Sequence, residues 1–579
     1  MKYSTLNELE TTREMIDVFC GYNHNLRINN GEFYDMENLS PAYYPVLSPR
    51  SGRGTYAEPA SAQGLIAKDS LCYVDGTHFV MNEHRVDMGL STKAEHCPKT
   101  LVSMGAYVII LPDKMYFNTL DVTDYGKIEE EYNSTGDVTF ELCNINGDVY
   151  ANATVSAGEP EKKNMALWID TSSTPHTLKQ YSASSAMWVS IPTTYIKIRA
   201  TGIGAKFGKY DGVTISGIKS EALKDLNAST IVWAKDDDYI VVTGILDEVT
   251  TQTAAQGAVR VERKMPDMDF VVEAGNRLWG CKYGMTSDKT VVNEIYACKL
   301  GDFKNWNSFM GLSTDSWVGS VGTDGQFTGA VTHLGYPVFF KETCLHKVYI
   351  SSAGAHQIQD TACRGVQKGS HRSLAIVNEV LYYKSRKSVC AYDGSLPVEI
   401  SAALGETQYS NAVAGGYGNL YYISMTDGKD YHLFCYDTAK GMWFREDKTR
   451  ADAFCFCRGE MYYIDHADGH IKTVSGGKEK VKWMAETGMI GITYPDAKYV
   501  SRLLLRMALD FGSIVRIYGQ YDSWGEWELL ATLSGISTRS FLAHVKPKRC
   551  DHMRLRIVGE GDAKIYSITK TIEQGSDVT

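Results

Sequence analysis

From Leu65 onward the chain repeats a short apolar and aromatic run, a polar turn and another such run. Runs of this length between turn residues predict β-strands. Helical periodicity is nearly absent. The best helix candidate covers residues 6–19, where Leu6, Leu9 and Met15 are loosely spaced, and an extended arm is the alternative there.

The apolar runs also form a weak internal repeat. Five of them begin at Leu278, Val338, Leu381, Leu420 and Met461, and two earlier ones begin at Leu71 and Tyr107. The later starts are separated by 60, 43, 39 and 41 residues, and one four-stranded propeller blade takes about 40 to 50 residues. We therefore predict an all-β chain that contains a β-propeller. A sandwich of unrelated hairpins is the alternative.

An interruption in the repeat and a change of pattern near its end predict the domain organisation. The interruption has strands of its own, which indicate a small inserted β-barrel or β-sandwich, and the regular runs after Val474 indicate a C-terminal β-sandwich. The predicted segments are an N-terminal arm with the first propeller strands (1–64), propeller blades (65–123), the inserted domain (124–264), further blades (265–475) and the C-terminal sandwich (476–579).

The amino-acid composition fits an all-β chain and argues against several classes of function. The 579 residues include 52 glycines but only 14 prolines, as expected for many strands joined by turns. No apolar run approaches the roughly 18 residues of a membrane-spanning helix, and the charged start gives no sign of a secretory signal. Without export, the 13 cysteines are expected to be reduced. The net charge of −10 argues against a general nucleic-acid binder.

Reaction motifs are missing from the sequence. It has no phosphate-binding loop, zinc-binding HExxH helix or GxSxG nucleophile turn. Cys455 and Cys457, followed by His466 and His470, have some resemblance to a zinc set, but strand cysteines that fill the core and histidines in a turn explain them better. We predict no metal and no cofactor.

Two other groups of residues are candidates for a metal site or for catalysis. Cys344 and His346 have no convincing second pair of metal ligands. Asp267 and Asp269 are candidates for paired catalytic carboxylates, although spacing alone does not identify such a pair. The sequence therefore gives no catalytic residue.

A group of basic residues is the clearest charge feature. It spans two predicted neighbouring strands and the loop between them, and it comprises Lys368, His371, Arg372, Lys384, Arg386 and Lys387. A solvated blade edge is one interpretation. A contact with a partner subunit or with passing DNA is the other, and it would use Lys368, Arg372, Lys384, Arg386 and Lys387.

Three segments resemble tail proteins encoded by phages and prophages of Gram-positive bacteria. Residues 19–50 end in an NLS…YPVLSPR pattern that is similar to the start of the podophage tail nozzle families, also called tail tubular protein B or stabilisation protein. Residues 369–394, with GSHRSL, a VLYY strand and YDG, resemble a blade of these families, and residues 549–577 resemble their C-terminal stretch.

This resemblance implies structural work in a virion rather than catalysis. Such proteins form a ring, usually of six copies, that continues the DNA-ejection channel below the portal and the adaptor. The implied partners are further copies of the chain as a homohexamer, the tail adaptor, tail fibre or tip proteins, and DNA that passes without sequence-specific binding. The implied location is the virion tail, after synthesis in the bacterial cytoplasm.

Two other functions remain open from the sequence. A receptor- or carbohydrate-binding protein at the tail tip would use exposed aromatic side chains such as Trp524, which lies in a predicted turn. A propeller glycosidase would need two acidic side chains that converge at one mouth of the propeller.

Overall fold

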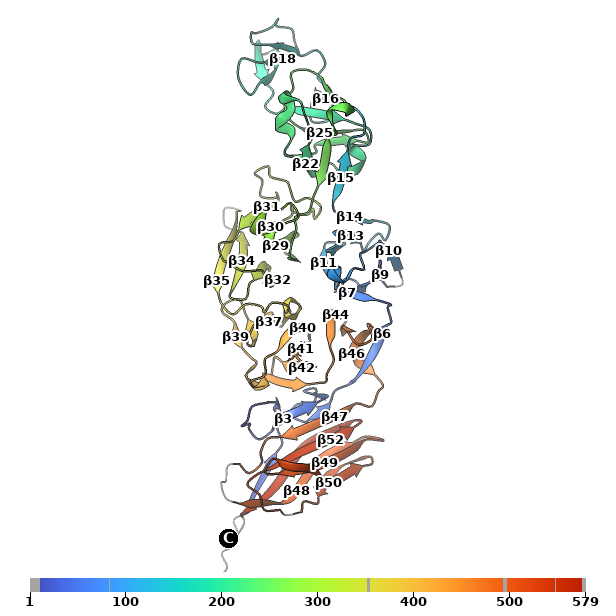
Figure 1. Ribbon diagram of the computed structural model, residues 1–579, viewed down its shortest axis with the longest axis vertical. Helices are drawn as coiled ribbons and strands as arrows, with labels where there is room; N and C mark the ends of the chain where they lie inside the picture. The colour runs from blue at the N-terminus through green and yellow to red at the C-terminus, as the bar shows by residue number, and fades with distance from the viewer. Residues whose placement is uncertain (1–10, 83, 351–354, 493–496, 547, 575–579) are drawn as a thin grey trace, which may run out of the picture.

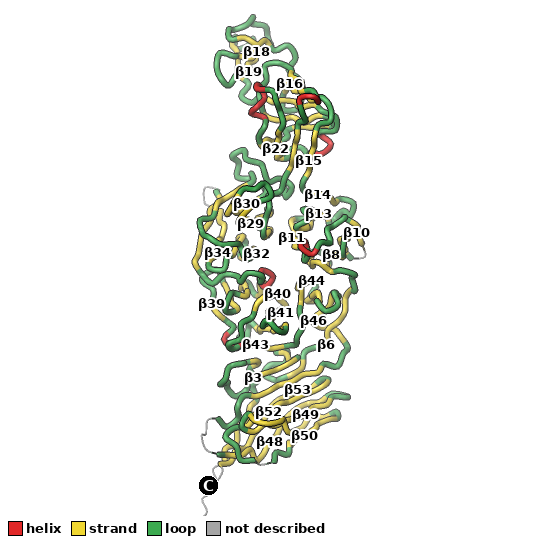
Figure 2. Tube along the Cα trace, in the orientation of Figure 1, coloured by secondary structure: helices red, strands yellow, loops and turns green. Residues whose placement is uncertain are grey.

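The computed structural model describes residues 11–82, 84–350, 355–492, 497–546 and 548–574. This part of the chain is almost entirely β-structure, and it forms an elongated molecule with an inserted domain, a propeller and a sandwich in a row (Figure 1). Figure 2 shows that strands and loops account for nearly all of it. The all-β fold class is thus as predicted. The short 3-10 helices are η1 (Ala94–His96), η2 (Gly204–Lys206), η3 (Glu221–Leu226), η4 (Ala254–Gln256), η5 (His371–Ser373) and η6 (Ala402–Leu404).

The propeller has seven four-stranded blades in the described part of the chain. The first strands face the centre, where most of them contact the first strand of the next blade. Four blades follow one another in the middle of the chain: β28 (Phe270–Glu273), β29 (Leu278–Met285), β30 (Val291–Ala297) and β31 (Trp317–Ser320); β32 (Gly329–His333), β33 (Tyr336–Phe340), β34 (Cys344–Ile350) and β35 (His356–Ala362); β36 (Ala375–Val377), β37 (Val380–Lys384), β38 (Val389–Tyr392) and β39 (Val398–Glu399); β40 (Ser410–Tyr417), β41 (Leu420–Thr426), β42 (Tyr431–Asp437) and β43 (Met442–Arg445).

The other three blades lie beside the N-terminal part of the chain. They are β7 (Ala62–Ala67), β8 (Leu71–Asp75), β9 (His78–Met81) and β10 (His84–Asp87); β11 (Thr100–Met104), β12 (Tyr107–Leu111), β13 (Met115–Asn118) and β14 (Tyr125–Lys127); and β44 (Ala451–Cys457), β45 (Glu460–Asp465), β46 (Ile471–Gly477) and β6 (Gly52–Ala57). The aligned runs of the sequence repeat are the second strands of all seven blades. These strands are paired on both edges and largely buried, which explains their apolar character.

The N-terminal strand β6 closes the propeller. It pairs antiparallel with β46, with Ile471 opposite Ala57, and is the outermost strand of the last blade. The last blade is therefore built from both ends of the chain, so the ring of blades is held closed by a ladder of backbone hydrogen bonds.

The inserted domain projects from one rim of the propeller (Figure 1). It has its own apolar core, which includes Phe140, Ile198 and Val261. Its strands are β15 (Glu130–Asn133), β16 (Val138–Cys143), β17 (Thr154–Ser156), β18 (Leu167–Asp170), β19 (Thr177–Ser182), β20 (Met187–Ser190), β21 (Tyr195–Arg199), β22 (Gly212–Ser216), β23 (Ser229–Ile231), β24 (Ala234–Asp236), β25 (Tyr239–Thr243), β26 (Thr250–Gln252) and β27 (Arg260–Arg263).

The sandwich lies at the opposite rim and also uses both ends of the chain (Figure 1). One sheet has the order β1 (Thr11–Ile16), β53 (Ala563–Gln574), β48 (Lys498–Leu509) and β51 (Ser537–Ala543). The other has the order β3 (Glu32–Glu37), β47 (Lys482–Thr487), β52 (Met553–Glu560), β49 (Ile514–Tyr521) and β50 (Trp524–Ser534), and β2 (Gly21–Tyr22) joins it to β43 of the propeller. Along the chain, the short strands β4 (Leu39–Ser40) and β5 (Ser48–Pro49) come after β3 of the sandwich and before β6 of the propeller.

The helix considered for residues 6–19 is not formed in its described part. Residues 11–16 form the strand β1, which pairs with β53 from Thr11–Glu573 to Ile16–Ile568. Pairing with the C-terminal strand thus determines the secondary structure of this segment, because its apolar positions are too loosely spaced for a helix. Residues 6–10 lie outside the described residues.

Candidate functional site

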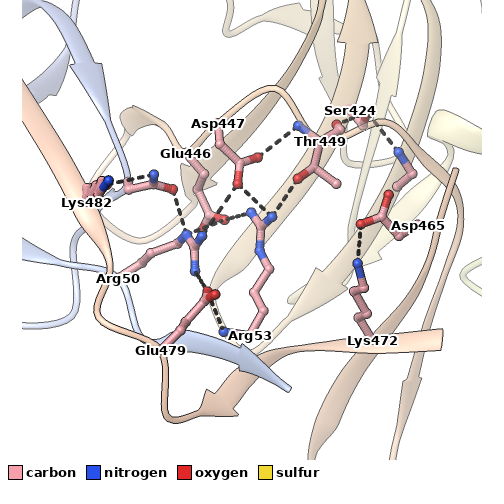
Figure 3. A network of polar contacts seen from close by, with 12 residues as sticks. Arg50, Arg53, Ser424, Glu446, Asp447, Thr449, Asp465, Lys472, Glu479 and Lys482 are labelled. Atoms are coloured by element: carbon pink, nitrogen blue, oxygen red, sulfur yellow. Dashed lines mark hydrogen bonds and ion pairs between the residues drawn. The ribbon is translucent and has the colours of Figure 1, made fainter. Parts of the chain in front are cut away.

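A buried network of charges lies where the propeller meets the sandwich (Figure 3). Arg53 of β6 contacts Glu446 at 2.8 Å and Asp447 at 2.7 Å, and both carboxylates directly follow β43. Arg50, just after β5, lies 3.8 Å from Glu446 and 3.5 Å from Asp447. Two buried guanidinium groups therefore face two carboxylates, and the exposed Glu479 lies 3.7 Å from Arg50.

Neutral partners extend this network, called here the Arg50–Arg53 network, into the sandwich. Arg50 donates to the side chain of Asn38 at 2.7 Å, and Asn38 donates to the carbonyl of Lys482 in β47 at 2.9 Å. Arg53 also donates to Thr449 at 2.5 Å. The N-terminal segment, the connection after β43 and the first sandwich strand after the propeller are thus held together by polar contacts.

The charges in this network depend on one another. Burial alone would raise the pKa of Asp447, but the charge of Arg53 and hydrogen bonds from Thr449 outweigh it and lower the pKa. Burial disfavours the charge of Arg53, and the attraction of Glu446 and Asp447 more than compensates and raises its pKa. Removing one member would leave a buried charge without its partner, which is costly.

An apolar core runs through the same junction. A single cluster of buried side chains includes Tyr421 and Trp443 of the propeller and Trp483, Leu505 and Ile557 of the sandwich. The two domains therefore share one core as well as one continuous ten-stranded sheet, from β40 to β50.

The centre of the propeller is bridged by Arg372. This side chain lies in η5, before β36, and donates to the carbonyl of Asp452 at 2.7 Å and to the carbonyl of Lys99 at 3.1 Å. Asp452 belongs to β44, and Lys99 directly precedes β11. Arg372 thus joins three blades across the axis. Burial lowers its pKa against the opposing effect of Asp452.

The basic group of the sequence divides into exposed and buried members. Lys368, Arg386 and Lys387 are exposed, and the backbone N–H of Gln367 donates to the carbonyl of Lys384, so the Lys368 loop lies beside the Arg386–Lys387 turn. These three cations remain available for a partner.

The interpretation of Lys384 and Arg372 as surface contacts is wrong. Lys384 is 2 % exposed, and its ammonium donates to the carbonyl of Ser385 at 2.6 Å. Burial lowers its pKa to about 8. Arg372 is occupied by the two carbonyls at the propeller centre. His371, which precedes it, is half-buried, and burial lowers its pKa to about 4.

Asp267 and Asp269 line a hollow of about 380 Å³ between the β11 and β28 blades, but each is held by a lysine. Lys114 lies 3.5 Å from Asp267, and Lys282 lies 2.6 Å from Asp269. Burial alone would raise the pKa of Asp267, but hydrogen bonds from Ser287 and the charge of Lys114 lower it. A general acid needs a raised pKa, so Asp267 is not suited to that role.

The cysteines and histidines considered for zinc do not converge. Cys455 and Cys457 pack in or against an apolar cluster, while His466 contacts Asp452 at 2.8 Å and His470 lies 3.6 Å from Asp468. Among the described residues, no group of three or more possible metal ligands is found. The core and turn interpretation of the sequence agrees with these contacts.

His346 forms an arrangement that the sequence did not indicate. Its Nδ1 lies 2.6 Å from Asp360 Oδ1, and its Nε2 lies 3.1 Å from Thr323 Oγ1 and 3.6 Å from Cys344 Sγ. Burial lowers the pKa of His346, and Asp360 opposes this effect. His346 is fully buried, so a substrate has no direct access to the imidazole. We interpret the group as a structural hydrogen-bond network of the β32–β35 blade.

Trp524 begins β50 and is 85 % exposed. The preceding residues Asp522 and Ser523 both have positive φ, as in a tight hairpin turn between β49 and β50. The turn directs Trp524 away from the core of the sandwich.

Comparisons with known proteins give no family for the chain. No family model matches it, and no curated protein matches it. Among solved structures, an exo-β-1,3-galactanase from Phanerochaete chrysosporium with galactose has 8 % identity and a TM-score of 0.21 over 52 % of this chain and 94 % of the galactanase chain. An engineered GH43 glycoside hydrolase has 9 % identity and a TM-score of 0.20, over 54 % and 98 %.

An acylaminoacyl peptidase from Pyrococcus horikoshii has 11 % identity and a TM-score of 0.23, over 50 % of this chain and 46 % of the peptidase. Likenesses at this level carry no argument about activity. No helix in the described part of the chain is long and apolar enough to cross a membrane.

The Arg50–Arg53 network is the feature that sequence reasoning missed. Arg50 belongs to the YPVLSPR pattern on which the family resemblance rests, but the pattern does not indicate its buried ion pairs. Arg53 and Glu446 are 393 residues apart in the chain, and no local pattern predicts that they meet.

Proposed function

We propose that the chain is a structural protein of a phage virion, a subunit of a tail nozzle that extends the DNA-ejection channel below the portal and adaptor. The observation that carries this proposal is the way residues 11–57 complete two domains. Strands β1 and β3 belong to the sandwich, and β6 closes the propeller. A chain tied together at both ends suits a part that must bear load.

The junction between propeller and sandwich supports the same proposal. To separate the two domains, the continuous ten-stranded sheet, the shared apolar core and the Arg50–Arg53 network must all be disturbed. A receptor that only presents a binding face has no need of so many connections. A ring that holds pressurised DNA needs rigid subunits.

DNA would pass between the copies of such a ring and not through a single propeller. Arg372 bridges the propeller centre, so the axis of each copy is occupied. The net charge of −10 favours passage without binding, because it repels phosphate. The expected partners remain six copies of the chain, the adaptor, tail fibre or tip proteins, and sliding DNA.

The tail-tip alternative rests on one observation, the exposure of Trp524. A sugar can stack on such an indole ring. Glycan-array binding that Trp524→Ala abolishes would favour this alternative, and we expect no such binding.

Electron microscopy of particles that carry an epitope-tagged chain tests the proposal. A ring of antibody label or of six-fold density beneath the portal is expected. Label confined to peripheral fibres would contradict the nozzle and favour the adhesin. Particles with the untagged chain are the control for antibody specificity.

A further inference from the structure

In the described part of the chain, β1 and β51 are the two outer strands of the sandwich sheet β1–β53–β48–β51. β1 has six residues and β51 has seven, and neither ladder that joins them to the sheet has a register shift. Several outer strands of the propeller are much shorter: β10, β14 and β39 have four, three and two residues. Short edge strands resist pairing with other chains, and long regular ones invite it.

The two edges present matching side chains. Pairing across the four strands places Ile16, Ile568, Leu505 and Phe541 in one row. The neighbouring row is Met15, Thr569, Leu504 and Leu542. At the ends of this second row, Met15 is 62 % exposed and Leu542 is 43 % exposed.

The strand directions also match. All three ladders of the sheet are antiparallel, so β1 and β51, three steps apart, run in opposite directions. A second copy that lays its β1 along β51 therefore adds an antiparallel strand and continues the alternation. Its Met15 can lie beside Leu542, which places its Ile16 beside the buried Phe541.

This register creates no like-charge pair at the edge. Arg539 faces Val18 of the next copy, and Arg13 of the next copy faces His544. Charged residues directly opposite one another would disfavour the pairing if their signs agreed. The apolar rows simply continue from one copy into the next.

We propose that copies of this chain associate by strand addition, with β1 of one copy paired to β51 of the next. The inference rests on the proposed function and names the contact that builds the ring. The two edges are different surfaces on opposite sides of one sheet, about 14 Å apart for three strand spacings. Each copy therefore uses both, and the contact is heterologous, which generates closed rings when the rotation permits.

Cysteine crosslinking in the full chain tests the contact. Met15→Cys and Leu542→Cys are made separately, purified, mixed at the highest soluble concentration and treated with a short bifunctional thiol reagent. We expect a covalent dimer in the mixture, no self-linked dimer of either variant alone, and a ladder of oligomers for the double variant. The unsubstituted chain, with its 13 native cysteines, sets the background.

Arg506→Cys is the matched control, because Arg506 is exposed on the middle strand β48 of the same sheet. A mixture of Met15→Cys with Arg506→Cys is expected to give only background. Self-linking of Met15→Cys or Leu542→Cys would show an isologous contact and overturn the proposal. A mixture that gives no dimer above background would also overturn it.

A second pair of variants tests assembly without a crosslink. Met15→Lys and Leu542→Lys add charge to the edges, and we expect each to reduce oligomer formation in sedimentation while the midpoint of thermal unfolding stays unchanged. Unchanged oligomers would contradict the proposal. If labelled particles show a ring beneath the portal but β1 and β51 do not crosslink, the strand contact is wrong and the nozzle proposal stands.

Discussion

Arg53 and Glu446 meet at 2.8 Å although one lies in the N-terminal strand of the propeller and the other follows its sixth blade in chain order. The side chain of Glu446 is 6 % exposed and that of Arg53 is 9 % exposed. Each of the two charges is stabilised in the interior by the other. The pair therefore couples closure of the propeller to the position of the sandwich.

Arg53→Ala is expected to destabilise the protein by about 3–5 kcal/mol, because it leaves Glu446 and Asp447 buried with reduced compensation. Urea unfolding followed by intrinsic fluorescence measures the change. Lys448→Ala is the matched control: its ion pair with Asp430 is exposed, and its loss should leave the stability nearly unchanged. Equal effects of the two substitutions would contradict a special role for the Arg50–Arg53 network.

Arg372→Met tests the bridge at the propeller centre. The substitution keeps an apolar stem but leaves the carbonyls of Asp452 and Lys99 without these donors. Each unsatisfied buried group costs about 1–3 kcal/mol, so we expect a loss of stability of at least about 1 kcal/mol. The control is Arg386→Met on the exposed turn, which should be nearly neutral. An unchanged unfolding midpoint for Arg372→Met would show that the bridge does not stabilise the ring of blades.

Lys384 should give the protein a distinctive dependence on alkaline pH. Its pKa is about 8 in the fold and about 10.4 in an unfolded chain. Below pH 8 the fold bears the cost of a buried ammonium, and this cost disappears as the pH rises through 8 toward 10.4. Lys384→Met should therefore stabilise the protein at pH 7 by about 3 kcal/mol, with the difference vanishing near pH 10.4.

Urea unfolding at pH 7 and at about pH 10 measures this difference. Lys387→Met, on the adjacent exposed position, is the control and should shift neither value. A Lys384→Met variant that is less stable than the parent at pH 7 would mean that the hydrogen bond to Ser385 outweighs the cost of burying the charge.

The sequence predicts the blades well because each contains one strand that is paired on both edges. Leu381, Leu420 and Met461 begin such runs or lie at their start, and their spacing reflects the size of one blade. Several of the outer strands are more polar, such as HQIQDTA in β35 and GRGTYA in β6, so the pattern does not separate them from loops. The sequence pattern does not identify β6 for this reason, and also because its partner strand β46 is far from it along the chain.

The basic group departs from the sequence-based prediction for a different physical reason. Lysine and arginine are rarely buried, so the exposed interpretation is the natural one for Lys384 and Arg372. Both find backbone carbonyls instead of solvent, and those carbonyls belong to the tertiary structure. The exposed Lys368, Arg386 and Lys387 follow the ordinary expectation.

His371 should make the protein sensitive to mild acid. Its pKa is about 4 in the fold because burial and the neighbouring Arg372 disfavour the charged imidazole, whereas an unfolded chain titrates near 6.5. Between these values the unfolded state binds more protons, so stability falls as the pH drops from about 6.5 to 4. The loss from this one group amounts to about 3 kcal/mol.

His371→Asn removes the titrating group. Its stability relative to the parent should therefore be higher at acidic pH than at pH 7.5. The measurement is urea unfolding of parent and variant at pH 7.5 and 4.5, with the change in their difference as the readout, since carboxylates elsewhere titrate equally in both. His84→Asn, at an exposed position, should leave that difference unchanged. If the difference in stability between His371→Asn and the parent is also the same at both pH values, His371 takes up its proton in the fold at pH 4.5. The packing around Arg372 must then accommodate two positive charges at that pH.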